Sequence, residues 1–161
     1  KHKVFVTILL LAIVFSNLSQ IFSKNKNGQT LLAIQEDLVI SKELQAIDYT
    51  YQSSGREEFS INTTTNPLWI NTTWSYLYNW YGLKNYGYLP KWTGRDQIGL
   101  LGNNLDKTDV IDPHYYIIEP TVAIPGKFLA ETLADENSRS SIVETAMFGE
   151  IEVQKRVPLE D

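Results

Sequence analysis

Residues 4–22 read VFVTILLLAIVFSNLSQIF, and this stretch divides the chain into two unlike parts. Its 19 residues, at about 1.5 Å per residue in a helix, span about 29 Å, which matches the hydrocarbon core of a bilayer. Lysines flank the stretch on both sides, in Lys-His-Lys before it and in Ser-Lys-Asn-Lys after it. We therefore expect a transmembrane helix within residues 1–28 and a folded domain over residues 29–161.

A secretory signal peptide is the alternative interpretation of this stretch, because a basic start followed by an apolar run also fits one. No small-residue cleavage pattern follows the run, and its end carries four polar residues: Ser16, Asn17, Ser19 and Gln20. Asn17 and Gln20 fall on one helical face. Such a face suits either packing against other helices of a multi-pass parent or the interfacial end of a single helix. The spanning helix is the interpretation that we follow.

Charge separates the two parts as well. The 161 residues carry a net charge of −5, with 43% hydrophobic and 20% charged residues, which argues against a disordered chain. Four lysines and no acidic residue precede Gly28, whereas residues 29–161 hold ten Lys or Arg against nineteen Asp or Glu. An acidic domain is poorly suited to bind a phosphate backbone, so we expect no nucleic acid partner.

Few side chains suggest metal binding or nucleophilic catalysis. The chain has no cysteine, and His114 is the only histidine outside the N-terminal flank, so we expect neither a zinc site nor a Ser-His-Asp triad. We interpret His114 as a packed residue of a strand. Asp106, Asp109 and Asp112 lack the glycine and glutamate of an EF-hand, which favours a solvated loop over a weak calcium site. Because the chain begins with Lys, we treat it as a processed or partial protein.

The domain alternates helix and strand signals along the chain. We expect a first helix over 31–52, capped by Thr30. A second helix is expected over 74–81, capped by Thr72 or Thr73 and stopped by Gly82. A third is expected from Pro125 to about residue 135. We expect strands over 58–65 and 114–119, two more within 141–157 around Phe148-Gly149, and a long loop over 83–112. This order predicts an α/β or α+β fold: one N-terminal transmembrane helix followed by a small mixed-sheet sandwich.

Aromatic residues gather in one segment of the domain. Residues 69–92 hold nine of them, including every tryptophan: Trp69, Trp74, Tyr76, Tyr78, Trp80, Tyr81, Tyr86, Tyr88 and Trp92. Trp74, Tyr78 and Tyr81 share one face of the expected helix. Three interpretations remain open: a domain core, a belt at the membrane interface, and a platform for a sugar or lipid headgroup.

A polar trio, Arg95-Asp96-Gln97, closes the aromatic run. Arg95 could bind a phosphate or carboxylate through its guanidinium fork, and Asp96 or Gln97 could bind sugar hydroxyls, although such a trio also commonly fixes a loop. We predict no catalytic residue and no metal ligand in this chain. The candidate ligand-binding residues are Trp74, Tyr78, Tyr81, Tyr86, Tyr88, Trp92, Arg95, Asp96 and Gln97.

Several phrases of the sequence resemble one known family. They are AIDYTY at 46–51, WSYLYNWYG at 74–82, YGYLP at 86–90, YYIIEP at 115–120 and FGEIEVQKR at 148–156, in that order after an apolar helix. They are similar to the carboxy-terminal end of bacterial multi-pass membrane glycosyltransferases of the GT-C class, the dolichyl-phosphate-mannose protein mannosyltransferase and aminoarabinose transferase type.

The resemblance implies that this chain is the last membrane helix and the extracytoplasmic C-terminal domain of an enzyme with a polyprenyl-phosphate-linked sugar donor. In that family the catalytic acidic residue lies near the amino terminus, so no catalytic position carries over, and the chain alone is expected to be inactive. Implied partners are membrane lipid, a polyprenyl-phosphate sugar or glycan acceptor, and the remaining transmembrane helices. No cofactor is implied here, and a divalent metal belongs at most to the parent enzyme.

From the residues alone, the alternative is a single-pass anchored module that binds a glycan or another cell-envelope ligand through residues 69–97. Both hypotheses place the chain in the cell membrane with its domain on the extracytoplasmic side.

Overall fold

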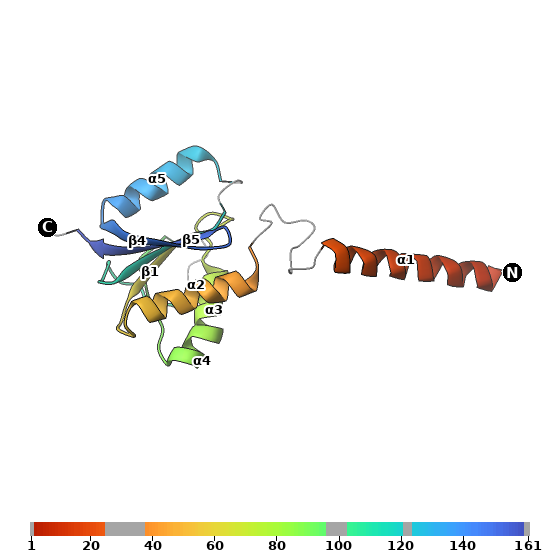
Figure 1. Cartoon of the computed structure of the whole chain (residues 1–161). Helices are drawn as coiled ribbons and strands as arrows, with labels where there is room; N and C mark the ends of the chain where they lie inside the picture. The colour runs from red at the N-terminus through yellow and green to blue at the C-terminus, as the bar shows by residue number, and fades with distance from the viewer. Residues whose placement is uncertain (1, 25–37, 96–102, 121–123, 160–161) are drawn as a thin grey trace.

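The computed structural model describes residues 2–24, 38–95, 103–120 and 124–159. The apolar stretch forms one continuous helix, α1 (His2–Lys24), which confirms the helix predicted over residues 4–22. Residues 2–23 of α1 are long and apolar enough to cross a membrane, by length and composition. None of this apolar window is buried against the domain, from which α1 stands apart in Figure 1.

The domain is built on a five-stranded mixed sheet, as the sequence predicts. Its strands are β1 (Ser60–Thr64), β2 (Lys91–Trp92), β3 (His114–Ile118), β4 (Ser140–Phe148) and β5 (Ile151–Pro158), in the spatial order β2-β1-β3-β5-β4. β1 pairs in parallel with β2 and with β3. β5 runs antiparallel to both β3 and β4, so the last two strands form a hairpin at the edge.

Helices cover both faces of this sheet (Figure 1). One face carries α2 (Ile40–Ser53) and a continuous helical segment made of α3 (Thr72–Leu77), the π-helix η1 (Tyr78–Gly82) and α4 (Leu83–Tyr86). The other face carries α5 (Gly126–Asn137). The domain is therefore a three-layer α/β arrangement with unequal outer layers.

The apolar core lies between the sheet and α2 with α3. Successive side chains of a strand point to opposite faces, and the residues that face α2 and α3 are apolar. The fully buried members of this core are Ala46, Ile47, Tyr51, Phe59, Ile61, Trp74, Tyr78, Tyr115, Ile117, Ile151 and Val153. Aromatic rings hold much of it together, because Tyr51 contacts Phe59, Tyr78, Tyr86 and Tyr88.

The alternate strand positions face α5 and are polar. They include Ser60 and Asn62 on β1, His114 on β3, and Gln154 and Arg156 on β5, and all five are buried. Buried polar groups require partners, so this layer has to be filled by hydrogen bonds and ion pairs instead of by apolar packing. The layer between sheet and α5 is where the candidate site lies.

Two predicted helix boundaries are wrong. The helix expected from residue 31 begins at Ile40, with Val39 in extended conformation before it, and residues 30–37 lie outside the described residues. The helix expected to stop at Gly82 continues to Tyr86 and ends at Gly87, whose φ of 85° is the left-handed conformation that glycine adopts without strain. Gly82 meets another requirement: a Cβ there would lie 2.7 Å from the Tyr51 hydroxyl.

The loop expected over 83–112 is also partly wrong. It contains α4 and the short strand β2, and Trp92 forms an isolated bridge with Lys107. The pattern is too short to reveal β2, because two residues carry no periodicity of their own. The strands expected over 58–65, 114–119 and 141–157 are confirmed, as is the helix after Pro125.

Candidate functional site

Glu136, on α5, is the centre of the polar layer. Its side chain has no exposed surface, and five groups surround its carboxylate. Oε1 accepts from His114 Nε2 at 2.8 Å and from the Ser140 hydroxyl at 2.9 Å. Oε2 accepts from Asn62 Nδ2 at 2.6 Å and from Arg139 Nη2 at 2.9 Å.

The charge state of Glu136 follows from these partners. Burial raises the pKa of a carboxyl group, but here the hydrogen bonds and charges of His114, Asn62 and Arg139 outweigh burial and lower the pKa of Glu136 to about 2. Glu136 is therefore ionised at neutral pH. Arg156 completes the cluster, with Nε 4.0 Å from Glu136 Oε1 and 2.8 Å from the Ser140 hydroxyl.

Ser60, His114 and Glu136 form a chain of hydrogen bonds that resembles a Ser-His-acid triad. His114 Nδ1 lies 2.8 Å from the Ser60 hydroxyl, and the ionised Glu136 can only accept, so His114 Nε2 carries a proton. Ser60 and His114 have no exposed surface, and the Ser60 hydroxyl also bonds the backbone of Ile111. A substrate has no access to this hydroxyl, so the packed role predicted for His114 is confirmed and the trio is structural.

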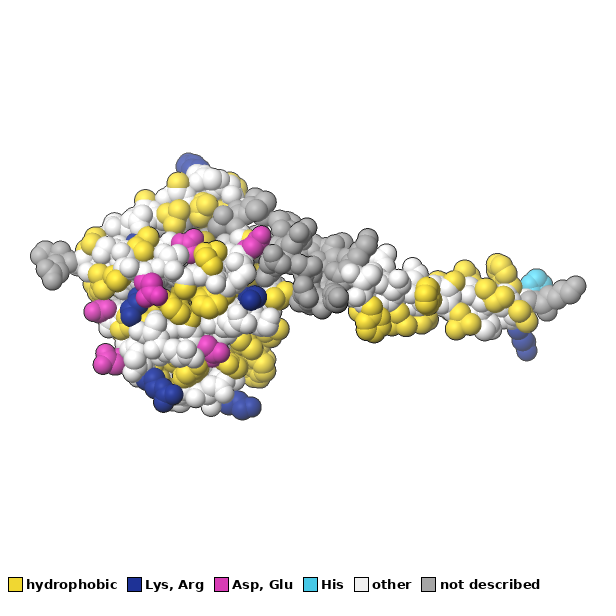
Figure 2. All heavy atoms as spheres, viewed as in Figure 1, with side chains coloured by type: hydrophobic (Ala, Val, Ile, Leu, Met, Phe, Trp, Pro, Cys, Tyr) yellow, Lys and Arg dark blue, Asp and Glu magenta, His cyan; other side chains and the backbone are white. Residues whose placement is uncertain are grey.

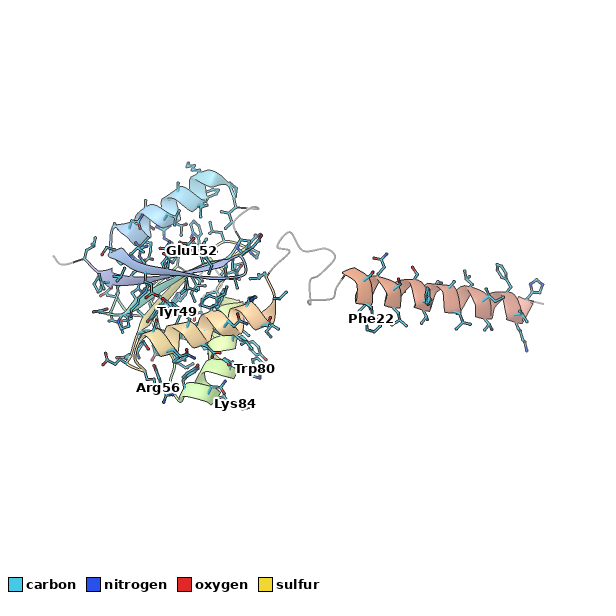
Figure 3. All side chains as sticks on the ribbon, viewed as in Figure 1. Phe22, Tyr49, Arg56, Trp80, Lys84 and Glu152 are labelled. Atoms are coloured by element: carbon cyan, nitrogen blue, oxygen red, sulfur yellow. The ribbon has the colours of Figure 1, made fainter. Side chains whose placement is uncertain are left out.

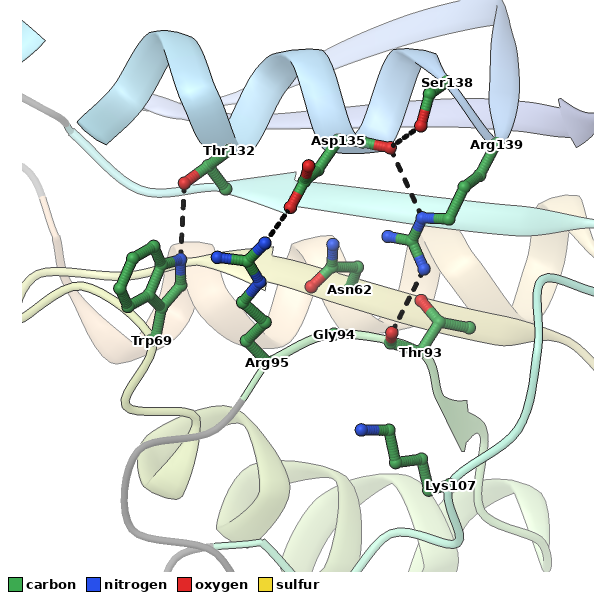
Figure 4. A pocket seen from close by; sticks show the side chains of 10 residues that line it. All are labelled: Asn62, Trp69, Thr93, Gly94, Arg95, Lys107, Thr132, Asp135, Ser138 and Arg139. Carbon is green, nitrogen blue, oxygen red and sulfur yellow. Dashed lines mark hydrogen bonds and ion pairs between the residues drawn. The ribbon is translucent and has the colours of Figure 1, made fainter. Parts of the chain in front are cut away.

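A cavity of about 340 Å³ lies in front of this buried cluster. It is bounded by the middle of β1, the residues that follow β2, the loop before α3, and α5 with the residues that follow it. Its lining residues are Asn62, Trp69, Thr93, Gly94, Arg95, Lys107, Thr132, Asp135, Ser138 and Arg139, all drawn in Figure 4. Three lining side chains are cationic and one, Asp135, is a carboxylate, so the cavity favours an anionic ligand.

Arg95 forms one wall of the cavity together with Trp69. The guanidinium lies 5.3 Å from the centroid of the Trp69 ring, and Nη2 lies 2.5 Å from Asp135 Oδ2 (Figure 4). Trp69 is held in turn by a hydrogen bond from Nε1 to the Thr132 hydroxyl at 3.3 Å. The charged ends of Arg95 and Asp135 are about half exposed, so a ligand can reach both.

Arg139 and Lys107 supply the other two positive charges. Arg139 is fixed at the end of α5, because it donates to the Thr93 carbonyl at 3.2 Å as well as to Glu136. Lys107 enters from the opposite side in Figure 4, and within the described residues no ion pair engages its ammonium group. The cavity thus combines two anchored guanidinium groups with one lysine that no ion pair engages among the described residues.

Two backbone features shape the cavity. A Cβ at Gly94 would lie 2.0 Å from Asn62 Oδ1 and 2.7 Å from the Trp92 ring, so only glycine allows the chain after β2 to pass so close to β1. Trp69 has a φ of 59°, a left-handed conformation that costs a residue with a side chain about 1–3 kcal/mol. The fold holds Trp69 in this conformation at the cavity wall.

The nine predicted ligand-binding residues fall into four groups. Trp74, Tyr78 and Trp92 are almost fully buried in the core, in agreement with the core interpretation for these three rings, and this burial leaves them little surface to offer a ligand. Arg95 lines the cavity. Asp96 and Gln97 lie outside the described residues.

The remaining three predicted residues pack around α2. The hydroxyls of Tyr81 and Tyr86 donate to the Asp48 carboxylate at 3.1 and 2.7 Å, and the Tyr88 hydroxyl donates to the Glu57 carbonyl. Burial and the neighbouring Asp48 raise the pKa of Tyr86 to about 12. None of these three side chains lines the cavity.

Several cavity residues escaped prediction from the sequence. Lys107 and Arg139 sit far from Arg95 in the chain and share no local pattern with it. Asn62 had a usable signal, because Ser60 and Asn62 alternate with Phe59 and Ile61 and so mark a polar face of β1. Within the described residues no group of three or more His, Asp or Glu is arranged to hold a metal ion.

Comparisons of this chain with protein-family models, with curated proteins and with solved structures found no match.

Proposed function

We propose that this chain is the membrane-anchored C-terminal part of a glycosyltransferase with a polyprenyl-phosphate-linked sugar donor, and that its domain binds a phosphorylated sugar without carrying out catalysis. The observation that carries the proposal is the cavity between Arg95, Lys107 and Arg139. The anchor is α1, whose length and composition suit a bilayer. The order of sequence phrases that resembles the GT-C enzymes suggests the reaction to which the domain contributes.

The chemistry of the cavity suits a sugar phosphate in two respects. Arg139 and Lys107 can donate charge-assisted hydrogen bonds to phosphate oxygens, which are stronger than neutral ones. The Trp69 ring at the cavity wall offers an apolar face of the kind that a sugar ring requires. The volume of about 340 Å³ is near the lower end of the range for ligand sites, so it fits a headgroup rather than a long glycan.

The same geometry argues for binding without catalysis. Asp135 is the one carboxylate among the described lining residues, and it is ion-paired with Arg95 at 2.5 Å. Glu136 lies behind the cavity wall with a pKa of about 2, so it is poorly suited to transfer protons at neutral pH. The full chain in detergent is accordingly expected not to turn over a polyprenyl-phosphate sugar.

Titration calorimetry of the full chain in detergent micelles tests the binding proposal. The probes are a hexose 1-phosphate, the same hexose without phosphate, and inorganic phosphate. We expect the hexose 1-phosphate to bind, and Lys107→Gln to weaken its binding about tenfold or more, because one charge-assisted hydrogen bond contributes about 1.5–3 kcal/mol. Lys127→Gln, which changes an exposed lysine of α5 outside the cavity lining, is the matched control and should bind like the unchanged chain.

Each other outcome has a definite meaning. Equal affinities of the unchanged chain and Lys107→Gln would contradict a phosphate site in this cavity. Binding of the neutral hexose as tight as that of its phosphate would favour the second hypothesis, a single-pass glycan-binding module. A polyprenyl-linked sugar phosphate that binds more tightly than the free one would identify the lipid-linked donor as the source of the headgroup.

A further inference from the structure

A hydrophobic patch lies on the domain outside the cavity lining. Tyr76, Trp80 and Leu83 expose 59%, 49% and 42% of their surface, and we call these three residues the aromatic patch. The Tyr76 and Trp80 rings are stacked, with centroids 6.2 Å apart and an angle of 6° between their planes. Figure 2 shows hydrophobic side chains gathered over this part of the domain, and Figure 3 places Trp80 on the side where α2 begins.

The periodicity of the helical segment Thr72–Tyr86 places the residues of the aromatic patch on one face. Trp74, Leu77 and Tyr78 turn one face of the segment into the core. Tyr76 and Trp80, four residues apart, share the opposite face, and Leu83 continues it one turn later. The core burial of Trp74 and Tyr78 therefore requires that the aromatic patch point outward.

Three observations identify a bilayer surface as the occupant. The first is connectivity: Ile40, the first residue of α2, is itself 55% exposed, and 15 residues, 25–39, join it to α1. Such a segment reaches at most about 50 Å when fully extended, so a domain tethered to a spanning helix stays close to the membrane. The second is chemistry, because Trp and Tyr are the residues that favour the headgroup region of a bilayer.

The third observation is charge. Lys84 follows Leu83 directly and is exposed, and Lys42 lies in the first turn of α2. These lysines stand out in a domain region, residues 29–161, that holds nineteen acidic residues against ten basic ones. A lysine beside an apolar patch, as Lys84 is, attracts anionic headgroups, whereas those headgroups repel acidic surface.

We infer that the aromatic patch docks on the membrane surface and fixes the orientation of the domain relative to the bilayer. This inference rests on the proposed anchoring of α1. The docked state is reversible, because the three side chains of the patch bury far less apolar surface than a spanning helix does. The occupant is the headgroup layer of an anionic membrane.

Spin labelling of the full chain in vesicles of phosphatidylcholine and phosphatidylglycerol tests the inference. The chain has no cysteine, so Leu83→Cys, Ile142→Cys and Phe15→Cys each give one labelling site. Ile142, on edge strand β4, is 51% exposed and serves as the matched control outside the patch, while Phe15 reports on α1. The ratio of collisions with oxygen to collisions with a nickel chelate measures contact with lipid.

We expect this ratio at position 83 to rise well above that at position 142, toward that at position 15. Adding Tyr76→Ser and Trp80→Ser should lower the ratio at position 83 to the value at position 142. Equal ratios at 83 and 142, with position 15 in lipid, would overturn the docking and leave the anchor intact. A water-like ratio at position 15 would overturn the anchor and the docking together. Low access of both reagents to position 83 would indicate a protein partner and also overturn the inference.

Discussion

At the scale of single residues, Glu136 determines how the layer under α5 is held together. It joins β1 through Asn62, β3 through His114 and the start of β4 through Ser140, all by hydrogen bonds shorter than 3.0 Å. An ionised carboxylate without these partners could not remain buried, because desolvation of a charge costs several kcal/mol. The stability of the layer therefore depends on the negative charge of one side chain.

This dependence predicts a specific loss of stability in acid. The pKa of Glu136 falls from 4.5 to about 2 on folding, so its contribution is complete above about pH 4.5 and is lost as the pH drops through about 2. The difference corresponds to about 3 kcal/mol. Glu136→Gln should unfold more easily at pH 7 and show a flatter dependence on pH between 4.5 and 2, measured by denaturant titration at each pH. An unchanged slope would contradict the assigned charge.

Gly94 carries a second prediction at this scale. Gly94→Ala forces a Cβ to 2.0 Å from Asn62 Oδ1, so we expect a loss of about 1–3 kcal/mol in the free energy of unfolding and weaker ligand binding. Gly126→Ala is the matched control, because a Cβ at this first residue of α5 meets no atom within 4 Å. Denaturation curves of the two variants should differ clearly. Equal stabilities would show that the chain after β2 can move away from Asn62.

At the scale of elements, the helical segment Thr72–Tyr86 divides its aromatic residues between core and surface. Trp74 is fully buried and donates from Nε1 to Glu119 at 2.8 Å, whereas Trp80, two turns of the same segment later, is 49% exposed. Because the two tryptophans differ so much in burial, the high number of aromatic residues in 69–92 could not show which rings are exposed to a ligand. The segment packs one face on the core and exposes the other, and both faces carry aromatic residues.

The division predicts opposite effects of equivalent substitutions. Trp74→Ala should cost about 3–5 kcal/mol in the free energy of unfolding, because it leaves a large cavity and removes the hydrogen bond from Trp74 Nε1 to Glu119. Trp80→Ala should change that free energy by about 0.5 kcal/mol or less, as surface substitutions usually do. Thermal or denaturant unfolding of both variants checks this. A severe loss for Trp80→Ala would mean that the exposed ring contributes to the core.

The strands, the helix ends and the cavity residues were predictable from the sequence to different degrees. Alternation in FSINT and in the hairpin around Phe148-Gly149 located β1, β4 and β5, because strand periodicity is a local property. The sequence suggested that the helical segment stops at Gly82, but it continues to Tyr86. Gly82 is required because a Cβ there would lie too close to the Tyr51 hydroxyl of another helix, a contact that no local pattern reveals. Arg95 was identified from its neighbours, whereas Lys107 and Arg139 reach the cavity only through tertiary contacts. Sequence patterns therefore described the elements better than the site.

At the scale of the whole molecule, the sheet separates two environments. The side that faces α2 and α3 is an apolar core, and the side that faces α5 is a charged layer opening into the cavity. Apolar packing supplies most of the driving force for folding, so the polar side is available for recognition. The outward face of the helical segment Thr72–Tyr86 carries the aromatic patch, which we propose docks on the membrane. Together, the two proposals place the sugar phosphate on one side of the sheet and the membrane surface on the other.

The central claim is that the cavity beside Trp69 binds a sugar phosphate, and the indole N–H signals of the four tryptophans test it most directly. Trp69 lines the cavity, whereas Trp74, Trp80 and Trp92 do not. Two-dimensional nitrogen–proton NMR of the full chain in micelles, titrated with a hexose 1-phosphate, should shift the Trp69 indole signal and leave the other three in place. No shift at Trp69, or a larger shift at Trp80, would contradict the claim.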